Sequence, residues 1–173
     1  MENDITIKVI PGKHLETESN SSFVKSMFKM FQEATLESDY MVTGEITSEE
    51  DVVKIFNNEN LTHIILFIGD LPVGYAQIIH RATSYAFASN AKINALSIIP
   101  QYRNHGLGKK LVQACLDWCI DNNILLVYLD VVHKNTVAKQ LYESFGFNKT
   151  GELLGAFKKD GEYLNIETYS KNL

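Results

Sequence analysis

Residues 103–110 combine glycine with positive charge in a pattern that suits an anionic ligand. They read Arg-Asn-His-Gly-Leu-Gly-Lys-Lys and follow an apolar run that ends at Pro100. Glycine lets the main chain approach a ligand closely, and free N–H groups at the start of a helix attract an anion. The segment lacks both the Gly-Lys-Ser/Thr of a P-loop and the first glycine of a dinucleotide-binding motif. It predicts a phosphate or pyrophosphate cradle, with a glycine-containing helix start and solvated charges as the alternative.

Hydrophobic periodicity predicts the elements that position this segment. Strands are expected over residues 5–9, 61–68, 73–79, 91–99, 125–132, 153–157 and 163–170. Helices are expected to begin at Ser21 or Ser22, at Ser48, near Gly108, and at Asn135 or Thr136. The polar residues 36–47 are expected to form a loop that faces a substrate. We therefore predict an α/β (α+β) fold in one domain over residues 1–173, with a central mixed, mostly antiparallel twisted sheet of about six to seven strands flanked by helices.

The charge of the chain is unevenly distributed. The 173 residues include 16 Lys and Arg against 21 Asp and Glu, a net charge of −5. Residues 71–116 contain five Lys or Arg and no acid, whereas residues 1–70 carry a net −8. The acidic total argues against general nucleic-acid binding, which needs an extended basic surface. A local anionic ligand in the cationic middle remains open.

Composition and run lengths exclude several classes of protein. With 45% hydrophobic residues and 3 Pro, the chain does not belong to the disordered or collagen-like classes. Its apolar runs are too short to span a bilayer, and Met1-Glu2-Asn3-Asp4 is not a signal-peptide start, so a cytoplasmic protein without a membrane partner is expected. Cys115 and Cys119 lie four residues apart in a helical pattern, which favours small buried side chains over a disulfide or metal site.

Two motifs resemble those of the GCN5-related N-acetyltransferase (GNAT) superfamily. Arg103-x-x-Gly106-x-Gly108 is similar to its acetyl-coenzyme-A signature, Arg/Gln-x-x-Gly-x-Gly/Ala. A later helix looks like its Asn-x-x-Ala-x-x-Leu-Tyr-x-x-x-Gly-Phe helix, and the matching residues are Asn135, Ala138, Leu141, Tyr142, Gly146 and Phe147. Both motifs occur in the right order among matching elements, so the resemblance covers nearly the whole chain. It implies a GNAT fold with splayed fourth and fifth strands, and acetyl-CoA as cosubstrate without a metal.

The resemblance also implies roles for individual residues. The main-chain N–H groups of Leu96, Ser97 and Ile98 would bind the pantetheine arm and polarise the thioester carbonyl. Arg103 would add positive charge beside the pyrophosphate, which the next residues would hold through their N–H groups: Asn104, His105, Gly106, Leu107, Gly108 and Lys109. Asn135 would contact the arm from the far side of the cleft. Tyr142 would protonate the departing thiolate, because a phenol of pKa about 10 stays protonated at neutral pH.

The sequence identifies less clearly the general base, which is the group that removes the proton of the amine. The predicted fourth strand has no carboxylate, whereas some members of the superfamily carry a glutamate there. In members that acetylate ribosomal-protein N-termini, a fifth-strand glutamate does this work, and the matching position here is Asp130. The alternative is that Asp130 is a strand-end residue bonded to nearby backbone. Glu33, Glu37 and Asp39 are further candidates if the acceptor binds over the first helix and its loop, although each would also suit a solvated helix face.

Several histidines and tyrosines have both a functional and a packing interpretation. His80 is a candidate to face the acceptor, and His133 lies near Asn135. No pair of histidines has metal-ligand spacing with a third ligand, so no metal site is expected. Three tyrosines would line an acceptor pocket or belong to the core, Tyr40, Tyr75 and Tyr85.

The resemblance implies an N-acetyltransferase that moves the acetyl group of acetyl-CoA directly to a primary amine in a ternary complex. The amine could belong to a polyamine, an amino acid, an aminoglycoside, or a protein or peptide. Because members of the superfamily often dimerise, a homodimer is one expectation. The alternative is a catalytically weak acyl-CoA-binding module that acts as a sensor or interaction partner.

Overall fold

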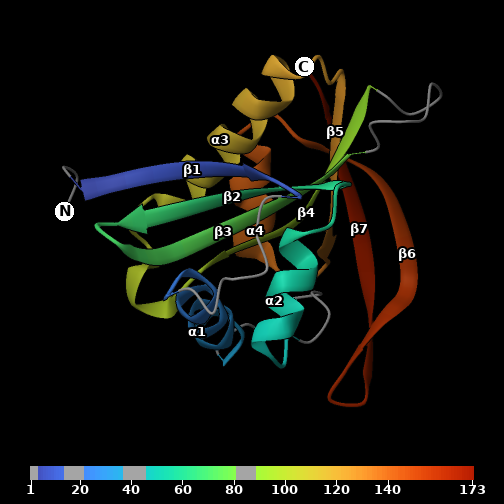
Figure 1. Ribbon diagram of the computed structural model, residues 1–173. Coiled ribbons are helices and arrows are strands. Elements are labelled where there is room, and N and C mark those ends of the chain that lie inside the picture. Colours follow the sequence, from blue (N-terminus) through green and yellow to red (C-terminus); the bar gives the residue numbers. More distant parts are fainter. Residues whose placement is uncertain (1–3, 14–21, 37–45, 81–88) are drawn as a thin grey trace.

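The computed structural model describes residues 4–13, 22–36, 46–80 and 89–173. Seven strands form one sheet in the order β1-β2-β3-β4-β5-β7-β6 (Figure 1). Their bounds are β1 Ile5–Pro11, β2 Leu61–Ile68, β3 Leu71–His80, β4 Asn90–Ile98, β5 Leu126–Val132, β6 Asn148–Lys159 and β7 Glu162–Asn172. The helices are α1 Ser22–Leu36, α2 Glu49–Phe56, α3 Leu107–Asp121 and α4 Thr136–Glu143, with a 3-10 turn at Pro100–Tyr102. Glu37, Asp39, Tyr40 and Tyr85 lie outside the described residues.

Strands β4 and β5 are the parallel pair in a sheet that is otherwise antiparallel. Their ladder runs from Asn90 opposite Leu126 to Ile93 opposite Leu129. Beyond Ile93, β4 continues to Ile98 along β3, whereas β5 continues to Val132 along β7. A parallel connection needs a crossover, which α3 supplies. The predicted fold class is thus confirmed, including a mixed sheet whose fourth and fifth strands separate.

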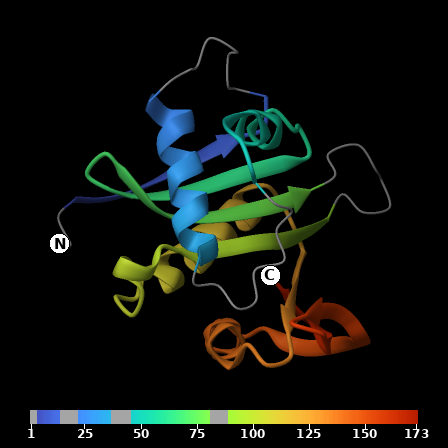
Figure 2. The same ribbon diagram turned by 90° about the horizontal axis from the view of Figure 1, so that it is seen from below.

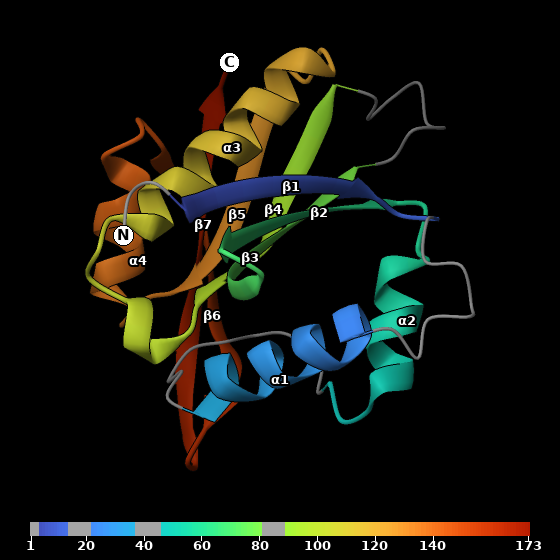
Figure 3. The ribbon, with the colours of Figure 1, turned by 60° about the vertical axis from the view of Figure 1, so that its left-hand side comes forward.

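Helices cover both faces of the sheet (Figure 3). α3 packs on one face with Leu111, Cys115 and Cys119, which are fully buried, and both cysteines are free thiols, as expected. α1 and α2 cover the other face, where the rings of Phe31 and Tyr75 lie 4.9 Å apart. α4 joins the α3 side, and Figure 2 shows it grouped with β6 and β7, away from α1 and α2. In the described parts of the chain, no helix has the length and apolar character needed to cross a membrane.

Local sequence signals account for the helix starts, and they were less informative for the last hairpin. Ser48 and Asp51 form the expected capping box of α2. The sixth strand was predicted over residues 153–157 but runs from Asn148 to Lys159. It is an edge strand with a register shift between Leu153 and Phe157, so its sequence shows little alternation of apolar and polar residues.

Candidate active site

The separation of β4 from β5 leaves one side of β4 without a neighbouring strand, and we call this region the fork. Its first residues are Asn94 on β4 and Asp130 on β5, directly after the last paired residues. The Ile99 N–H donates to the Val73 carbonyl at 3.0 Å, so Ile99 points its main-chain groups toward β3. Main-chain groups alternate along a strand, which directs those of Ile98 toward the fork.

This alternation applies to all three residues predicted to hold the pantetheine arm. Leu96 has the orientation of Ile98, so both direct their N–H groups into the fork, whereas Ser97 directs its N–H toward β3. A strand edge with unpaired N–H groups is suited to bind an extended chain that carries carbonyl groups. Of the three residues, Leu96 and Ile98 therefore direct main-chain N–H groups into the fork, whereas Ser97 does not.

The predicted phosphate cradle lies at the amino end of α3, next to the end of β4. Gly106 is the N-cap residue, with φ 74°, and a Cβ atom built there would meet no atom within 4 Å. This left-handed conformation favours glycine, and the space beside Gly106 is open to a ligand. No side chain caps the helix, so the first-turn N–H groups of Leu107 and Gly108 remain available. The N–H of Lys109 donates back to the Gly106 carbonyl at 3.1 Å.

Side chains of the predicted cradle make contacts within the loop itself. Arg103 Nε donates to the Ile98 carbonyl at 3.0 Å, which ties the loop to the fork side of β4. His105 Nδ1 lies 2.7 Å from the Arg103 carbonyl, and Asn104 has φ 64°. The Leu107 side chain is buried, so its main chain is the part that can face a ligand. These contacts are made within the loop and to the end of β4, and Lys109 is exposed beside the loop.

Helix α4 lies against the start of α3 and carries the second motif. A Cβ atom on Gly108 would lie 3.4 Å from the Leu141 side chain, so glycine at this position also permits close helix packing. The side-chain oxygen of Asn135 accepts from the Ala138 N–H at 3.1 Å and so caps α4. The NH₂ group of Asn135 is not used in this cap. Lys139 of α4 pairs with Glu167 of β7 at 3.3 Å, which anchors the helix to the sheet.

Tyr142 is buried between α4 and the core. Its ring lies 5.9 Å from that of Phe147 in an edge-on arrangement. Burial is the main cause that raises the pKa of Tyr142 above its usual value, and the neighbouring Cys115 adds to it. The hydroxyl makes no hydrogen bond to any other described residue. Tyr142 therefore holds its proton, which is the state that a proton donor needs.

Asp130 is held on both of its oxygens. Lys92 Nζ lies 2.8 Å from Oδ2, and the Thr168 hydroxyl donates to Oδ1 at 2.7 Å. Both carboxylate oxygens are therefore occupied by contacts that link β5 to β4 and to β7. Both partners of Asp130 are side chains, whereas the alternative stated from the sequence was that Asp130 bonds to nearby backbone. Glu33, the other described candidate, lies 3.8 Å from Lys29 within α1.

Other candidates from the sequence have packing roles among the described residues. His80 packs against Trp118 of α3, with ring centroids 4.8 Å apart, and so lies on the face opposite α1. His133 Nδ1 accepts from the Asn165 N–H at 3.1 Å. Tyr75 is buried in the core beneath α1. Asn94 was not predicted as a site residue, because its position at the fork depends on strand register, although it is a polar residue in an otherwise apolar strand.

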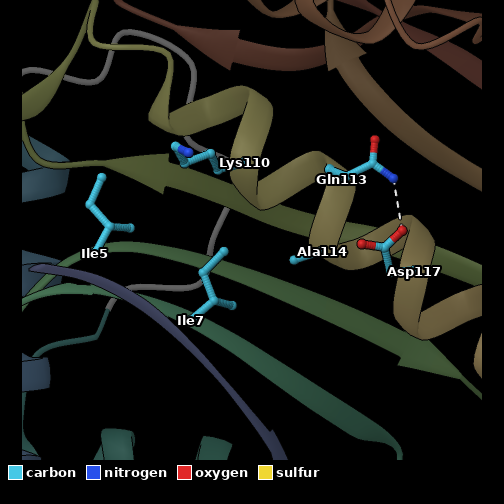
Figure 4. A pocket seen from close by; sticks show the side chains of 6 residues that line it. All are labelled: Ile5, Ile7, Lys110, Gln113, Ala114 and Asp117. Atoms are coloured by element: carbon cyan, nitrogen blue, oxygen red, sulfur yellow. Dashed lines mark hydrogen bonds between the residues drawn. The ribbon is translucent and has the colours of Figure 1, made fainter. Parts of the chain in front are cut away.

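A separate hollow lies on the outer side of the molecule. It lies between β1 and α3 (Figure 4) and is lined by Ile5, Ile7, Lys110, Gln113, Ala114 and Asp117. Its volume is about 460 Å³. Gln113 donates to Asp117 at 2.8 Å across one wall. The lining residues come from the β1 side of α3, so this hollow is not part of the fork.

Comparison with known proteins places this geometry in a family. Residues 25–147 match the model of the acetyltransferase (GNAT) family. A ribosomal protein bS18-alanine N-acetyltransferase of Haemophilus ducreyi is 26% identical over 61% of this chain and 81% of its own length. A GNAT-family acetyltransferase of Streptococcus pneumoniae has a similar structure, with a TM-score of 0.81 at 19% identity, covering 98% of this chain and 99% of that one. A Salmonella typhimurium structure described as an acetyltransferase with its cofactor acetyl-CoA has a TM-score of 0.79 at 15% identity, covering 98% and 94%.

Proposed function

The chain belongs to the acetyltransferase (GNAT) family, whose members use acetyl-CoA, and we propose that it transfers the acetyl group directly to a primary amine in a ternary complex. The observation that carries this proposal is the fork. The main-chain groups of Leu96 and Ile98 point into it, and the Gly106 cradle lies at the end of the same strand. A cosubstrate with a pyrophosphate at one end and an amide-containing arm fits these two features together.

The residues at the fork and the cradle would divide the binding of acetyl-CoA between them. The N–H groups of residues 104–108 would hold the pyrophosphate, with Lys109 adding charge. The Leu96 and Ile98 N–H groups would hold the arm and polarise the acetyl carbonyl, and the free NH₂ of Asn135 would contact the arm from α4. When bound, acetyl-CoA supplies an acyl group activated as a thioester. Fixed donors of this kind stabilise charge that develops on a carbonyl oxygen, without a metal or a covalent enzyme intermediate.

Tyr142 would donate the proton that the departing thiolate needs. Its phenol stays protonated because burial raises its pKa. A phenol that keeps its proton can act as a general acid toward a departing thiolate.

The amine must lose a proton as it attacks the carbonyl. Asp130 is engaged elsewhere, because Lys92 and Thr168 contact both of its oxygens. We propose that water at the fork accepts the proton of the amine. Asp130 instead holds β4 against β5 through its ion pair with Lys92. The relative from Haemophilus ducreyi is named for acetylation of an alanine of ribosomal protein bS18. A peptide with a free amino-terminal alanine is therefore the first acceptor to test.

The test is coenzyme-A release from acetyl-CoA with three acceptor classes: an alanine-terminated peptide, a polyamine and a free amino acid. The acetylated product is identified by mass spectrometry, and acetyl-CoA affinity is measured separately by calorimetry. We expect tight binding and turnover with at least one class, the peptide first. Tight binding without turnover of any amine would instead support a catalytically weak acyl-CoA-binding module.

A further inference from the structure

A continuous chain of hydrogen bonds crosses the core beneath α1 and α2 and ends at the fork. His63 Nδ1 of β2 lies 2.8 Å from the Tyr75 hydroxyl of β3, and Gln77 Nε2 donates to that hydroxyl at 3.1 Å. Asn94 Nδ2 of β4 donates to Gln77 Oε1 at 2.7 Å. The first three residues are buried, whereas Asn94 is half-buried at the fork. The chain therefore links a fully buried imidazole to the proposed reaction site.

The strand register explains why Asn94 joins this chain. Gln77 pairs with Ala95 and Ile78 pairs with Ile93, so Asn94 is the extra residue of a bulge in β4. A bulge turns a side chain away from its regular direction and often lies next to a functional site. Burying polar groups costs free energy unless each finds a partner, and such networks define orientation when they are satisfied.

The contacts determine the direction of each hydrogen bond. Because Gln77 donates to the Tyr75 hydroxyl, the Tyr75 proton is available to His63 Nδ1. The His63 ring is neutral at pH 7, since burial lowers its pKa to about 4, and it then carries its single proton on Nε2. Among the described residues, Nε2 is buried and has no partner at hydrogen-bond geometry. The main-chain carbonyl of Ile55 is the contact that favours a proton on the ring. The opposite tautomer would place a lone pair against that carbonyl.

This direction determines which atom of Asn94 is free. Gln77 uses its NH₂ group on Tyr75, so its oxygen faces β4 and accepts from Asn94 Nδ2. The Asn94 oxygen is then the remaining polar atom, and it has no hydrogen-bond partner in the described part of the chain. An amide oxygen with two lone pairs is a good acceptor for an N–H group.

We propose that Asn94 presents its side-chain oxygen to the acceptor amine at the fork, and that His63, Tyr75 and Gln77 are positioning residues behind it. The inference rests on the proposed function, in that an amine enters the fork. An amide oxygen accepts an N–H of the amine and leaves its lone pair free to attack. A carboxylate there would stabilise the unreactive ammonium form, whereas the neutral amide does so far less. Asn94 thus orients the nucleophile without serving as its base.

The direction of the chain can be tested without any substrate. Two-bond ¹H–¹⁵N correlation spectra of uniformly ¹⁵N-labelled protein distinguish the two neutral tautomers of histidine. We expect His63 to be the Nε2–H tautomer at neutral pH. An Nδ1–H tautomer would reverse every hydrogen bond in the chain, turn the Asn94 NH₂ toward the fork, and overturn the proposal.

The role of Asn94 is tested by steady-state kinetics with the best amine of the acceptor panel. We expect Asn94→Leu and Gln77→Met to raise the KM for the amine about tenfold, with the KM for acetyl-CoA unchanged, as the loss of one oriented hydrogen bond predicts. In Gln77→Glu the Tyr75 hydroxyl must donate to the carboxylate, but an oxygen still accepts from Asn94 Nδ2, so we expect a near-normal KM for the amine. Asn90→Ala, at the paired start of β4, is the matched control and should change neither KM.

Two outcomes separate this inference from the function on which it rests. An amine KM that stays unchanged in Asn94→Leu would overturn the role of Asn94 while leaving acetyl transfer intact. Wild-type protein that acetylates no amine would count against the proposed function, and the His63 tautomer would still decide the direction of the chain. Thermal melts of each variant show whether any change in KM comes from a folded protein.

Discussion

The Lys92 ammonium lies 2.8 Å from the Asp130 carboxylate, and this ion pair joins β4 to β5 beside the point where the two strands separate. Each partner is only about a quarter to a third exposed, at 25% and 34%. The pair thus closes the inner end of the fork and occupies the carboxylate that the sequence had suggested as a base.

Asp130→Asn should have a small effect on turnover and a measurable effect on stability. Because water and not Asp130 accepts the amine proton in our proposal, we expect kcat/KM to fall less than about threefold. The free energy of unfolding should fall by up to about 1 kcal/mol, as for a partly exposed ion pair. Urea unfolding and steady-state kinetics measure the two effects. A loss of a hundredfold or more in kcat/KM would identify Asp130 as the general base.

Gly106→Val should abolish acetyl-CoA binding. A β-branched side chain is strained at φ 74° and would fill the open space beside the main chain. We expect the Kd measured by calorimetry to rise at least about a hundredfold. Gly161→Val is the matched control, because Gly161 has φ 84° and open space around it but lies in the β6–β7 hairpin. It should lose similar stability and keep its affinity; equal losses of affinity in both variants would contradict the cradle.

Tyr142→Phe should lower kcat by about a hundredfold or more while leaving the Kd for acetyl-CoA nearly unchanged, because it removes only the donated proton. The raised pKa of Tyr142 adds a prediction about pH. The donor must be protonated, so Tyr142 should produce no alkaline decline in kcat below its ordinary pKa of about 10. Tyr163→Phe, at an exposed tyrosine, is the control. Unchanged kcat at every pH would reduce Tyr142 to a packing role.

His63 should make the protein less stable in mild acid. Burial lowers its pKa from 6.5 to about 4 in the folded state, so between these values the unfolded chain binds a proton that the folded chain does not. The free energy of unfolding therefore falls as pH drops from about 6.5 toward 4, by about 3 kcal/mol at 1.36 kcal/mol per pKa unit. Urea unfolding of wild type and His63→Gln across this range gives the free energy of unfolding of each as a function of pH. The contribution of His63 is the difference between the slopes of these two curves. Parallel slopes would show that His63 does not titrate in this way.

The sequence predicted the order of strands and helices well, because each depends on local patterns. The capping box at Ser48 and the glycine at the start of α3 are signals that short segments carry by themselves. The prediction was poorest for β6, which at the sheet edge buries few side chains and so lacks a hydrophobic alternation. Register was not readable either, and the bulge at Asn94 depends on how β4 aligns with β3.

The sequence by itself determined the family motifs, the glycine that can adopt a left-handed conformation at position 106, and the separation of charge along the chain. Only the tertiary structure decided the partners of the polar groups. Thr168 reaches Asp130 across 38 positions, and Asn94 reaches Gln77 across 17. Whether a carboxylate is free to act as a base, or an amide oxygen faces a substrate, depends on these long-range contacts. They arise from strand pairing, in which a shift of one residue would turn each side chain to the other face.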